Sequence, residues 1–208
     1  MSTPPATHAE MEALYTSSIE TRTADILKLL TLTNSVGSNA VHDLIIAQYR
    51  VMRARDELIN ARLEALDKDI SYANRAPELE AESKLLHTHF FVELGKLLTP
   101  PDIEKIKDKM TYNKVKITFE AYTNIIPGLT ESDKAKITEL LTAAREKAID
   151  GGSASEKSEI FQEYKNQINA YLNAHGHDVA KAYKDWDAKQ ALAKASTEGS
   201  SPGTNSVQ

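Results

Sequence analysis

The sequence predicts an all-α fold, a single-domain bundle of about seven helices with a disordered C-terminal tail. Apolar residues recur three and four positions apart along most of the chain, which is the spacing of one face of a helix. The 208 residues include only 8 Gly and 7 Pro, so turn formers are scarce, whereas the good helix formers Ala, Leu, Lys and Glu are common. A chain of this length can bury a substantial core.

The domain boundaries follow from where the apolar pattern begins and ends. We expect a disordered lead at residues 1–8 and a helical domain at residues 9–195. The tail at residues 196–208 is rich in Ser, Gly and Thr and has no apolar pattern, so we expect it to be disordered.

The first half of the chain should form three helices. Apolar stripes at helical spacing cover residues 11–30, 41–66 and 77–97. Pro77 suits the first turn of the third helix, because the first turn does not need its missing N–H. We therefore interpret residues 70–77 as a connection.

Shorter helices should fill the second half of the chain. The apolar stripes predict helices at residues 100–110, 119–126, 129–148, 153–172 and 178–192. Residues 112–117 alternate with period two, but a lone strand cannot satisfy its backbone, so we expect an irregular crossing there. Gly151–Gly152 separates two of the helices, and Ser153 with Glu156 fits a capping box for the second.

A Leu-Thr pair precedes three of these helices, at residues 32–33, 98–99 and 129–130. An apolar anchor followed by an N-cap threonine explains this recurrence. Duplication of a helical hairpin is the alternative.

Composition excludes several classes of function. The net charge of −5 disfavours nucleic acid as a partner, because phosphate binding needs concentrated positive charge. No apolar run is long enough to span a membrane. There is no cysteine, and hence no disulfide or thiol chemistry. The first residues lack a signal-peptide pattern, which fits a cytoplasmic protein or an exported one whose leader has been replaced.

Histidines give no convincing metal site. His87 and His89 are two residues apart on a predicted helix, so their rings point to different faces. His175, His177 and Asp178 lie in a turn, with no cysteine and no second spaced pair to complete a site. The chain has no phosphate-binding loop, dinucleotide fingerprint or nucleophile elbow, and we predict no metal and no cofactor.

The most informative polar stretch is the junction at residues 144–153. Glu146 and Asp150 lie four residues apart on one helix face, and they are either a salt-bridged pair or a carboxylate pair for acid–base chemistry. The amides around Gly151–Gly152 could bind an anion or a sugar hydroxyl, but a helix-to-helix turn with a glycine stop explains them without any function. Tyrosines of the C-terminal half could stack on sugars or pack in the core. The candidate ligand-binding residues are Tyr112, Arg145, Glu146, Asp150, Ser153, Lys157, Tyr164 and Asn169, and no catalytic residue is assigned.

The segment from Leu98 to Trp186 resembles a known family. The matching stretches include Leu98-Thr99-Pro100, Met110-Thr111-Tyr112, Ala144-Arg145-Glu146-Lys147-Ala148 and Tyr171-Leu172. On these residues the chain resembles the bacterial family named domain of unknown function 3826, with residues 98–178 as the most similar core. The resemblance implies a helical, exported protein (periplasmic or extracellular), and the role suggested for that family is sugar binding.

Three functions are therefore open. The first is an exported, non-catalytic accessory protein that binds carbohydrate. The second is a periplasmic helical chaperone or interaction module, because the Leu-Thr helix starts are similar to those of Spy- and CpxP-type chaperones. The third is a carbohydrate-active enzyme that uses Glu146 and Asp150.

Overall fold

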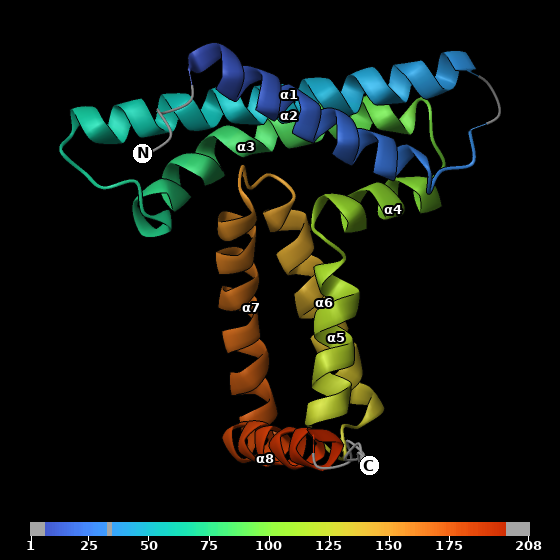
Figure 1. Ribbon diagram of the computed structural model, residues 1–208, viewed down its shortest axis with the longest axis vertical. Helices are drawn as coiled ribbons and strands as arrows, with labels where there is room; N and C mark the ends of the chain where they lie inside the picture. Colours follow the sequence, from blue (N-terminus) through green and yellow to red (C-terminus); the bar gives the residue numbers. More distant parts are fainter. Residues whose placement is uncertain (1–6, 33–34, 199–208) are drawn as a thin grey trace, which may run out of the picture. The chain divides into compact units, whose positions relative to one another are not determined.

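A computed structural model describes residues 7–32 and 35–198 of the protein, and these residues form eight helices and no strand (Figure 1). The predicted all-α class is therefore confirmed, with a helix count close to seven. The helices are α1 (His8–Leu27), α2 (Ser35–Ala65), α3 (Tyr72–Gly95), α4 (Pro100–Met110), α5 (Lys114–Ile125), α6 (Glu131–Ala148), α7 (Ala154–Ala174) and α8 (Val179–Glu198). Most of the predicted lead and tail, residues 1–6 and 199–208, lies outside the described residues.

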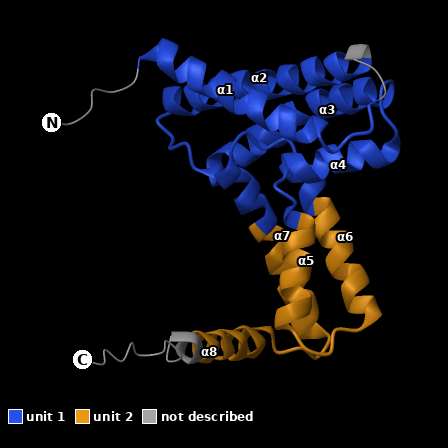
Figure 2. Ribbon diagram, turned by 45° about the vertical axis from the view of Figure 1, so that its right-hand side comes forward, with its two compact units in different colours: residues 1–114, 144–161 blue, residues 115–143, 162–208 orange. Residues whose placement is uncertain are grey.

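The helices group into two compact units (Figure 2). Unit 1 comprises Met1–Lys114 and Ala144–Phe161, and unit 2 comprises Val115–Ala143 and Gln162–Gln208. Helices α6 and α7 therefore contribute residues to both units.

Unit 1 is organised around the long helix α2, which lies beside α1 and α3 (Figure 1). Apolar side chains at helical spacing on these helices meet α4 and the end of α6 in one core. Burying each large apolar side chain contributes about 1.5–3 kcal/mol before the entropy of ordering is subtracted. The buried members of this core are Ile19, Ile26, Val41, Ile45, Tyr49, Met52, Phe90, Leu94, Ile106, Met110 and Ile149.

In unit 2, α5, α6 and α7 run alongside one another, and α8 lies across their ends (Figure 2). Its core is apolar, with Ile137, Leu141, Ile168 and Leu172 completely shielded from solvent. Tyr122 is also buried, and its hydroxyl donates to Oδ1 of Asn169 at 2.7 Å.

In two of the Leu-Thr pairs the threonine, Thr99 or Thr130, stands directly before its helix, as the recurring-cap interpretation expects. Thr130 accepts from the Asp133 amide at 3.1 Å, and the Asp133 carboxylate accepts from both the amide and the hydroxyl of Thr130. These bonds hold the pKa of Asp133 at about 2. Thr99 likewise donates to the Asp102 carboxylate at 2.8 Å, but its hydroxyl accepts no amide hydrogen bond, because the Asp102 amide donates to the Thr99 carbonyl at 3.0 Å. The third pair includes Thr33, which lies outside the described residues.

Two local expectations were wrong. Lys114–Ile117 is not an irregular crossing but the first turn of α5. The break is confined to Tyr112 and Asn113, whose φ angles of 59° and 54° end α4 and redirect the chain in two residues. In addition, α3 begins at Tyr72, so Pro77 lies inside the helix rather than at its start.

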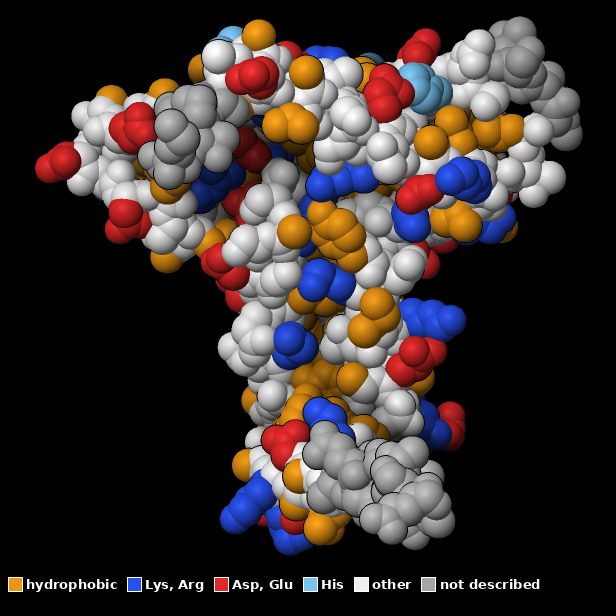
Figure 3. All heavy atoms as spheres, viewed as in Figure 1, with side chains coloured by type: hydrophobic (Ala, Val, Ile, Leu, Met, Phe, Trp, Pro, Cys, Tyr) orange, Lys and Arg blue, Asp and Glu red, His pale blue; other side chains and the backbone are white. Residues whose placement is uncertain are grey.

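The surface shows no membrane-spanning element among the described residues, since none of their helices combines the necessary length and apolarity. On the face shown in Figure 3, hydrophobic side chains reach the surface in small groups between charged and polar ones. Such scattered apolar exposure is ordinary in folded proteins.

Candidate functional site

The turn between α6 and α7 is built around a buried arginine from α2. Arg55 donates from Nη1 to the Ser83 hydroxyl at 2.8 Å and from Nη2 to the Asp150 carbonyl at 2.6 Å. Its Nε and Nη2 also donate to Oδ1 of Asp56, at 3.1 and 2.8 Å. The guanidinium thus ties α2, α3 and the turn together, and it satisfies a carbonyl that the end of α6 leaves without a helical partner.

A second arginine, Arg75 from α3, continues this network. Its guanidinium lies 3.2 Å from Oδ1 of Asp56 and donates to Oε1 of Glu156 at 3.2 Å. It also donates to Asn60. The other oxygen of Glu156 accepts from the Gly152 amide at 2.7 Å. Both carboxylates are buried among cations and amides, which offsets the cost of removing them from water.

Neighbouring atoms leave little room for a side chain at either of the two consecutive glycines. A Cβ atom on Gly152 would lie 1.5 Å from Oδ2 of Asp56, a distance that no atom pair tolerates. A Cβ atom on Gly151 would lie 3.1 Å from Cγ of Lys157 and 3.2 Å from the Ala148 carbonyl oxygen. The turn therefore needs glycine because side chains of other helices approach its backbone closely.

Two side chains cap the helices on either side of this turn. The Ser153 hydroxyl accepts from the Glu156 amide at 3.0 Å, as the capping-box pattern indicates. The Lys157 ammonium donates to the carbonyls of Ala148 and Ile149 at 2.9 and 3.0 Å, closing the end of α6. Burial lowers the pKa of Lys157 to about 8, against the opposing pull of nearby carboxylates.

Arg145 and Glu146 belong to a separate cluster with α4. Arg145 donates to Asp108 at 2.6 Å, to Glu146 at 3.0 Å and to Glu104. Lys107 donates to the other oxygen of Glu146 at 2.7 Å. These residues fasten the end of α6 to α4, and Glu146 is held by two cations.

Asp150 pairs with a histidine instead. Its Oδ2 lies 3.0 Å from Nδ1 of His87 on α3, and this hydrogen bond raises the pKa of His87. Both residues line a cavity of about 460 Å³ in unit 1, whose lining includes Tyr72, Leu79 and Ile160. Glu146 does not line that cavity.

The other two candidates, Tyr164 and Asn169, lie on the part of α7 that belongs to unit 2. Asn169 accepts the Tyr122 hydroxyl proton there. Of the eight candidate residues, six lie in unit 1 and two in unit 2.

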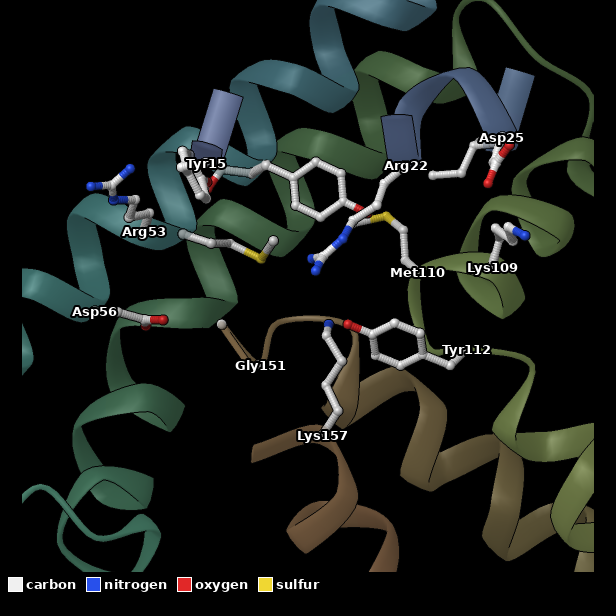
Figure 4. A pocket seen from close by; sticks show the side chains of 14 residues that line it. Tyr15, Arg22, Asp25, Arg53, Asp56, Lys109, Met110, Tyr112, Gly151 and Lys157 are labelled. Atoms are coloured by element: carbon white, nitrogen blue, oxygen red, sulfur yellow. The ribbon is translucent and has the colours of Figure 1, made fainter. Parts of the chain in front are cut away.

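A different cavity is lined by polar groups that have no partner among the described residues. It measures about 270 Å³ and lies within unit 1, between α1, α2, the end of α4, the Gly151–Gly152 turn and α7 (Figure 4). Two candidate residues, Tyr112 and Lys157, line it. Figure 4 shows the side chains of Arg22, Tyr112 and Lys157 pointing toward the same space.

Four polar side chains of this lining have no partner among the described residues; Arg22 and Tyr112 are exposed, Lys109 is half-buried and Tyr49 is buried. Arg22 and Lys109 form no hydrogen bond or ion pair with any of the residues that the structure describes. The hydroxyls of Tyr49 and Tyr112 likewise make no hydrogen bond within the described ranges. Burial raises the pKa of the Tyr49 phenol to about 12, so it remains a hydrogen-bond donor at neutral pH.

The other charged groups of the lining are already paired. Arg53 donates to Glu12 at 2.8 Å and to Glu57 at 2.9 Å, and its guanidinium stacks 4.3 Å above the Tyr15 ring. Asp25 accepts from Lys28 at 2.9 Å. Asp56 is held by the two arginines described above. The charge left without a partner in this cavity is therefore positive.

The backbone at Tyr112 is unusual for a tyrosine. Both Tyr112 and Asn113 have positive φ angles, a region that non-glycine residues occupy only when the surrounding structure holds them there. The Asn113 amide donates to the Asp108 carbonyl at 2.7 Å and fixes the turn. This turn places the Tyr112 ring in the cavity wall.

The sequence-based candidates do not include Arg22, Tyr49 and Lys109, which also line this cavity. Arg22 lies three residues after buried Ile19 and four before buried Ile26. Arg55, which has protein partners, lies at the same spacing between buried Met52 and Ile59, so this spacing does not mark a ligand site.

The chain is thus an all-helical protein with a polar, cationic cavity inside one of its two units. Comparison with protein families places it in a family described as protein of unknown function (DUF3826), whose profile matches residues 16–192. The chain belongs to this family, which confirms the resemblance seen in its sequence. The match includes Arg22, Tyr49, Lys109, Tyr112 and Lys157. Comparison with curated proteins gave no match.

Proposed function

We propose that this protein binds a carbohydrate without transforming it, and that the ligand enters the cavity between α1, α2, α4 and α7. The observation that supports this proposal is that one cavity is lined by four polar side chains without a partner among the described residues, Arg22, Tyr49, Lys109 and Tyr112. The proposal agrees with the sugar-binding role that the family resemblance implies.

The cavity wall combines apolar and hydrogen-bonding side chains, and a sugar ring can use both. Tyr15, Tyr49, Tyr112, Met52 and Met110 offer apolar surface to the C–H face of such a ring. The hydroxyls and cations can bond to its hydroxyl groups. A purely apolar ligand would bury these polar groups without partners, at a cost of about 1–3 kcal/mol for each.

Size also favours a small ligand. The cavity of about 270 Å³ is slightly below the range of roughly 300–1,000 Å³ that is usual for small-molecule sites. It suits one sugar ring or the end of a chain. A nucleic acid fits neither this size nor the net charge of −5.

The proposed function is binding without catalysis, because the carboxylates of Glu146 and Asp150 are paired with basic residues of the protein. Glu146 pairs with Arg145 and Lys107, and Asp150 pairs with His87. Neither carboxylate lines the cavity with the unpartnered groups.

We also propose that the protein acts outside the cytoplasm, as the resemblance implies. A cysteine-free chain can fold in an oxidising compartment without forming unwanted disulfides. Fractionation of the native cells with an antibody tests this, and recovery in the cytoplasmic fraction alone would reject it.

The binding proposal is tested by calorimetry with a panel of monosaccharides and short oligosaccharides. Tyr112→Phe keeps the ring and removes the hydroxyl, so we expect it to weaken binding by about tenfold or less, the value of one hydrogen bond. The matched control is Tyr171→Phe on α7, outside this cavity, which should leave the affinity unchanged. Absence of binding across the panel would reject the proposed function.

A further inference from the structure

The charge of the cavity indicates which sugars it prefers. Its lining includes the cations Arg22, Arg53, Lys109 and Lys157, and the anions Asp25 and Asp56. Both anions and Arg53 are bound to other protein groups. Arg22 and Lys109 form no ion pair or hydrogen bond with any described residue, although the charge of Lys109 acts on Asp25 from a distance.

Lys157 adds a further positive charge to the lining of this cavity. The residue is only 4% exposed, and its ammonium uses two of its three N–H groups on the carbonyls of Ala148 and Ile149. Figure 4 shows this ammonium directed toward the same space as the Arg22 guanidinium and the Tyr112 hydroxyl, and repulsion by the Arg22 charge adds to burial in lowering the pKa of Lys157. Two cations therefore face one space with no anion between them, an arrangement that an anionic ligand group would relieve.

The available donors match an oxyanion. A guanidinium presents a planar fork of N–H groups that binds a carboxylate or sulfate through two parallel hydrogen bonds. The hydroxyls of Tyr49 and Tyr112 add two uncharged donors in the same wall. Lys109 lies nearer the Asp25 side of the cavity, where it adds positive potential at the rim (Figure 4).

We propose that the ligand of this cavity is an acidic saccharide, a sugar whose carboxylate or sulfate ester is bound by Arg22, with Tyr112 and Lys157 beside it. This inference rests on the proposed function, because it specifies the class of sugar that the same cavity binds. Arg22 is the residue that determines specificity, and Lys109 attracts the acidic group by its charge.

The test compares acidic sugars with their neutral parents by calorimetry. Glucuronate is paired with glucose, galacturonate with galactose, and glucose 6-sulfate with glucose, with acetate and inorganic sulfate as sugar-free anions. We expect at least one acidic sugar to bind about tenfold or more tightly than its parent, and more tightly than either free anion. That preference should weaken as NaCl is raised, whereas the affinity for a neutral sugar should not change.

Substitutions test which residues cause the preference for acidic sugars. Arg22→Gln should lower the affinity for the acidic sugar about 10- to 100-fold and leave the affinity for the neutral parent within about twofold. Lys109→Gln should have a smaller effect in the same direction. The control is Arg62→Gln, an exposed cation of α2 outside the cavity, which should change neither affinity. Circular dichroism verifies that each variant is folded.

The outcomes separate the two proposals. If neutral and acidic sugars bind equally well and without salt dependence, the acidic-saccharide inference is overturned and the proposed function stands. If acetate or sulfate binds as tightly as the acidic sugar, the site recognises an anion and the inference is again overturned. If no sugar binds at all, both proposals fall.

Discussion

Two groups of basic residues in unit 1 have opposite surroundings. Arg55, Arg75 and Arg145 each bind two or more protein oxygens around the end of α6 and the turn after it. Arg22 and Lys109, in the wall of the 270 Å³ cavity, bind none of the residues that the structure describes. Basic residues thus hold helices together around the end of α6, whereas those in the cavity wall have no such partner among the described residues.

This difference separates residues kept for folding from residues available to a ligand. Removing one partner of a buried ion pair leaves the other charge uncompensated, so the paired cations should matter for stability. A cation without a partner contributes little to stability, and it can give its full interaction to an arriving anion.

Gly152→Ala should be the most destabilising of the changes considered. Its Cβ atom would meet Asp56 Oδ2 at 1.5 Å, which forces the carboxylate away from Arg55 and Arg75. Overpacking costs roughly 1–3 kcal/mol, and disruption of the paired charges adds to this, so we expect a loss of about 3 kcal/mol. Urea unfolding followed by circular dichroism measures the change.

Gly95→Ala is the matched control for this substitution. A Cβ atom on Gly95 has nothing within 4 Å, and the residue ends α3 without a positive φ angle. The change should be neutral or stabilise the protein by up to about 1 kcal/mol. Equal losses for both variants would show that close approach of Asp56 is not the reason for the glycine.

Arg145→Met should have the next largest effect. It removes the cation that binds Asp108, Glu146 and Glu104, and leaves three carboxylates close together. Loss of one member of a fully buried pair costs about 3–5 kcal/mol, but these carboxylates are partly exposed, so we expect about 2 kcal/mol. Arg62→Met, at an exposed ion pair, should cost less than about 1 kcal/mol in the same denaturation assay.

Local patterns in the sequence predict much of this junction. The apolar spacing predicts helices on both sides, the glycine pair predicts the break, and Ser153 with Glu156 predicts the cap that the structure contains. These features depend on residues within a few positions of one another. The helix start at Tyr72 was missed, because Pro77 offered a more conspicuous signal than Ser71, which stands at the N-cap.

Pairing across the chain could not be predicted in the same way. Arg55 and the Asp150 carbonyl are 95 residues apart, and Arg145 and Asp108 are 37 apart. No local pattern distinguishes these arginines from Arg22. Six of the eight candidate residues lie in unit 1, yet only Tyr112 and Lys157 line the cavity, because partner choice depends on tertiary packing.

The pair formed by His87 and Asp150 should make stability depend on pH. The bond to Asp150 raises the pKa of His87 above its ordinary value of 6.5, with smaller effects from Glu146 and Lys107. Its contribution to stability is therefore fully present below pH 6.5 and is lost as pH rises through the higher, folded-state pKa.

Urea unfolding of the native protein and of His87→Gln at a series of pH values tests this dependence. The difference in unfolding free energy between the two should be largest at acidic pH and should shrink above neutrality. His89→Gln, at an exposed residue on the same helix, is the control and should show no such trend. A difference that is constant with pH would contradict a charged His87–Asp150 pair.

The smallest effect on stability is expected for Arg22→Met, which should change the unfolding free energy by no more than about 0.5 kcal/mol in either direction. Arg22 forms no ion pair among the described residues, so its removal leaves no anion unpaired. Its cation repels that of Lys157, and this repulsion adds to burial in lowering the pKa of Lys157. Relief of that repulsion can offset the lost packing of the arginine stem. A loss of about 2 kcal/mol, equal to that of Arg145→Met, would remove the distinction between the two groups of cations. A neutral change would mean that folding does not require this cation, so any effect of Arg22 variants on sugar affinity could be assigned to binding rather than to unfolding.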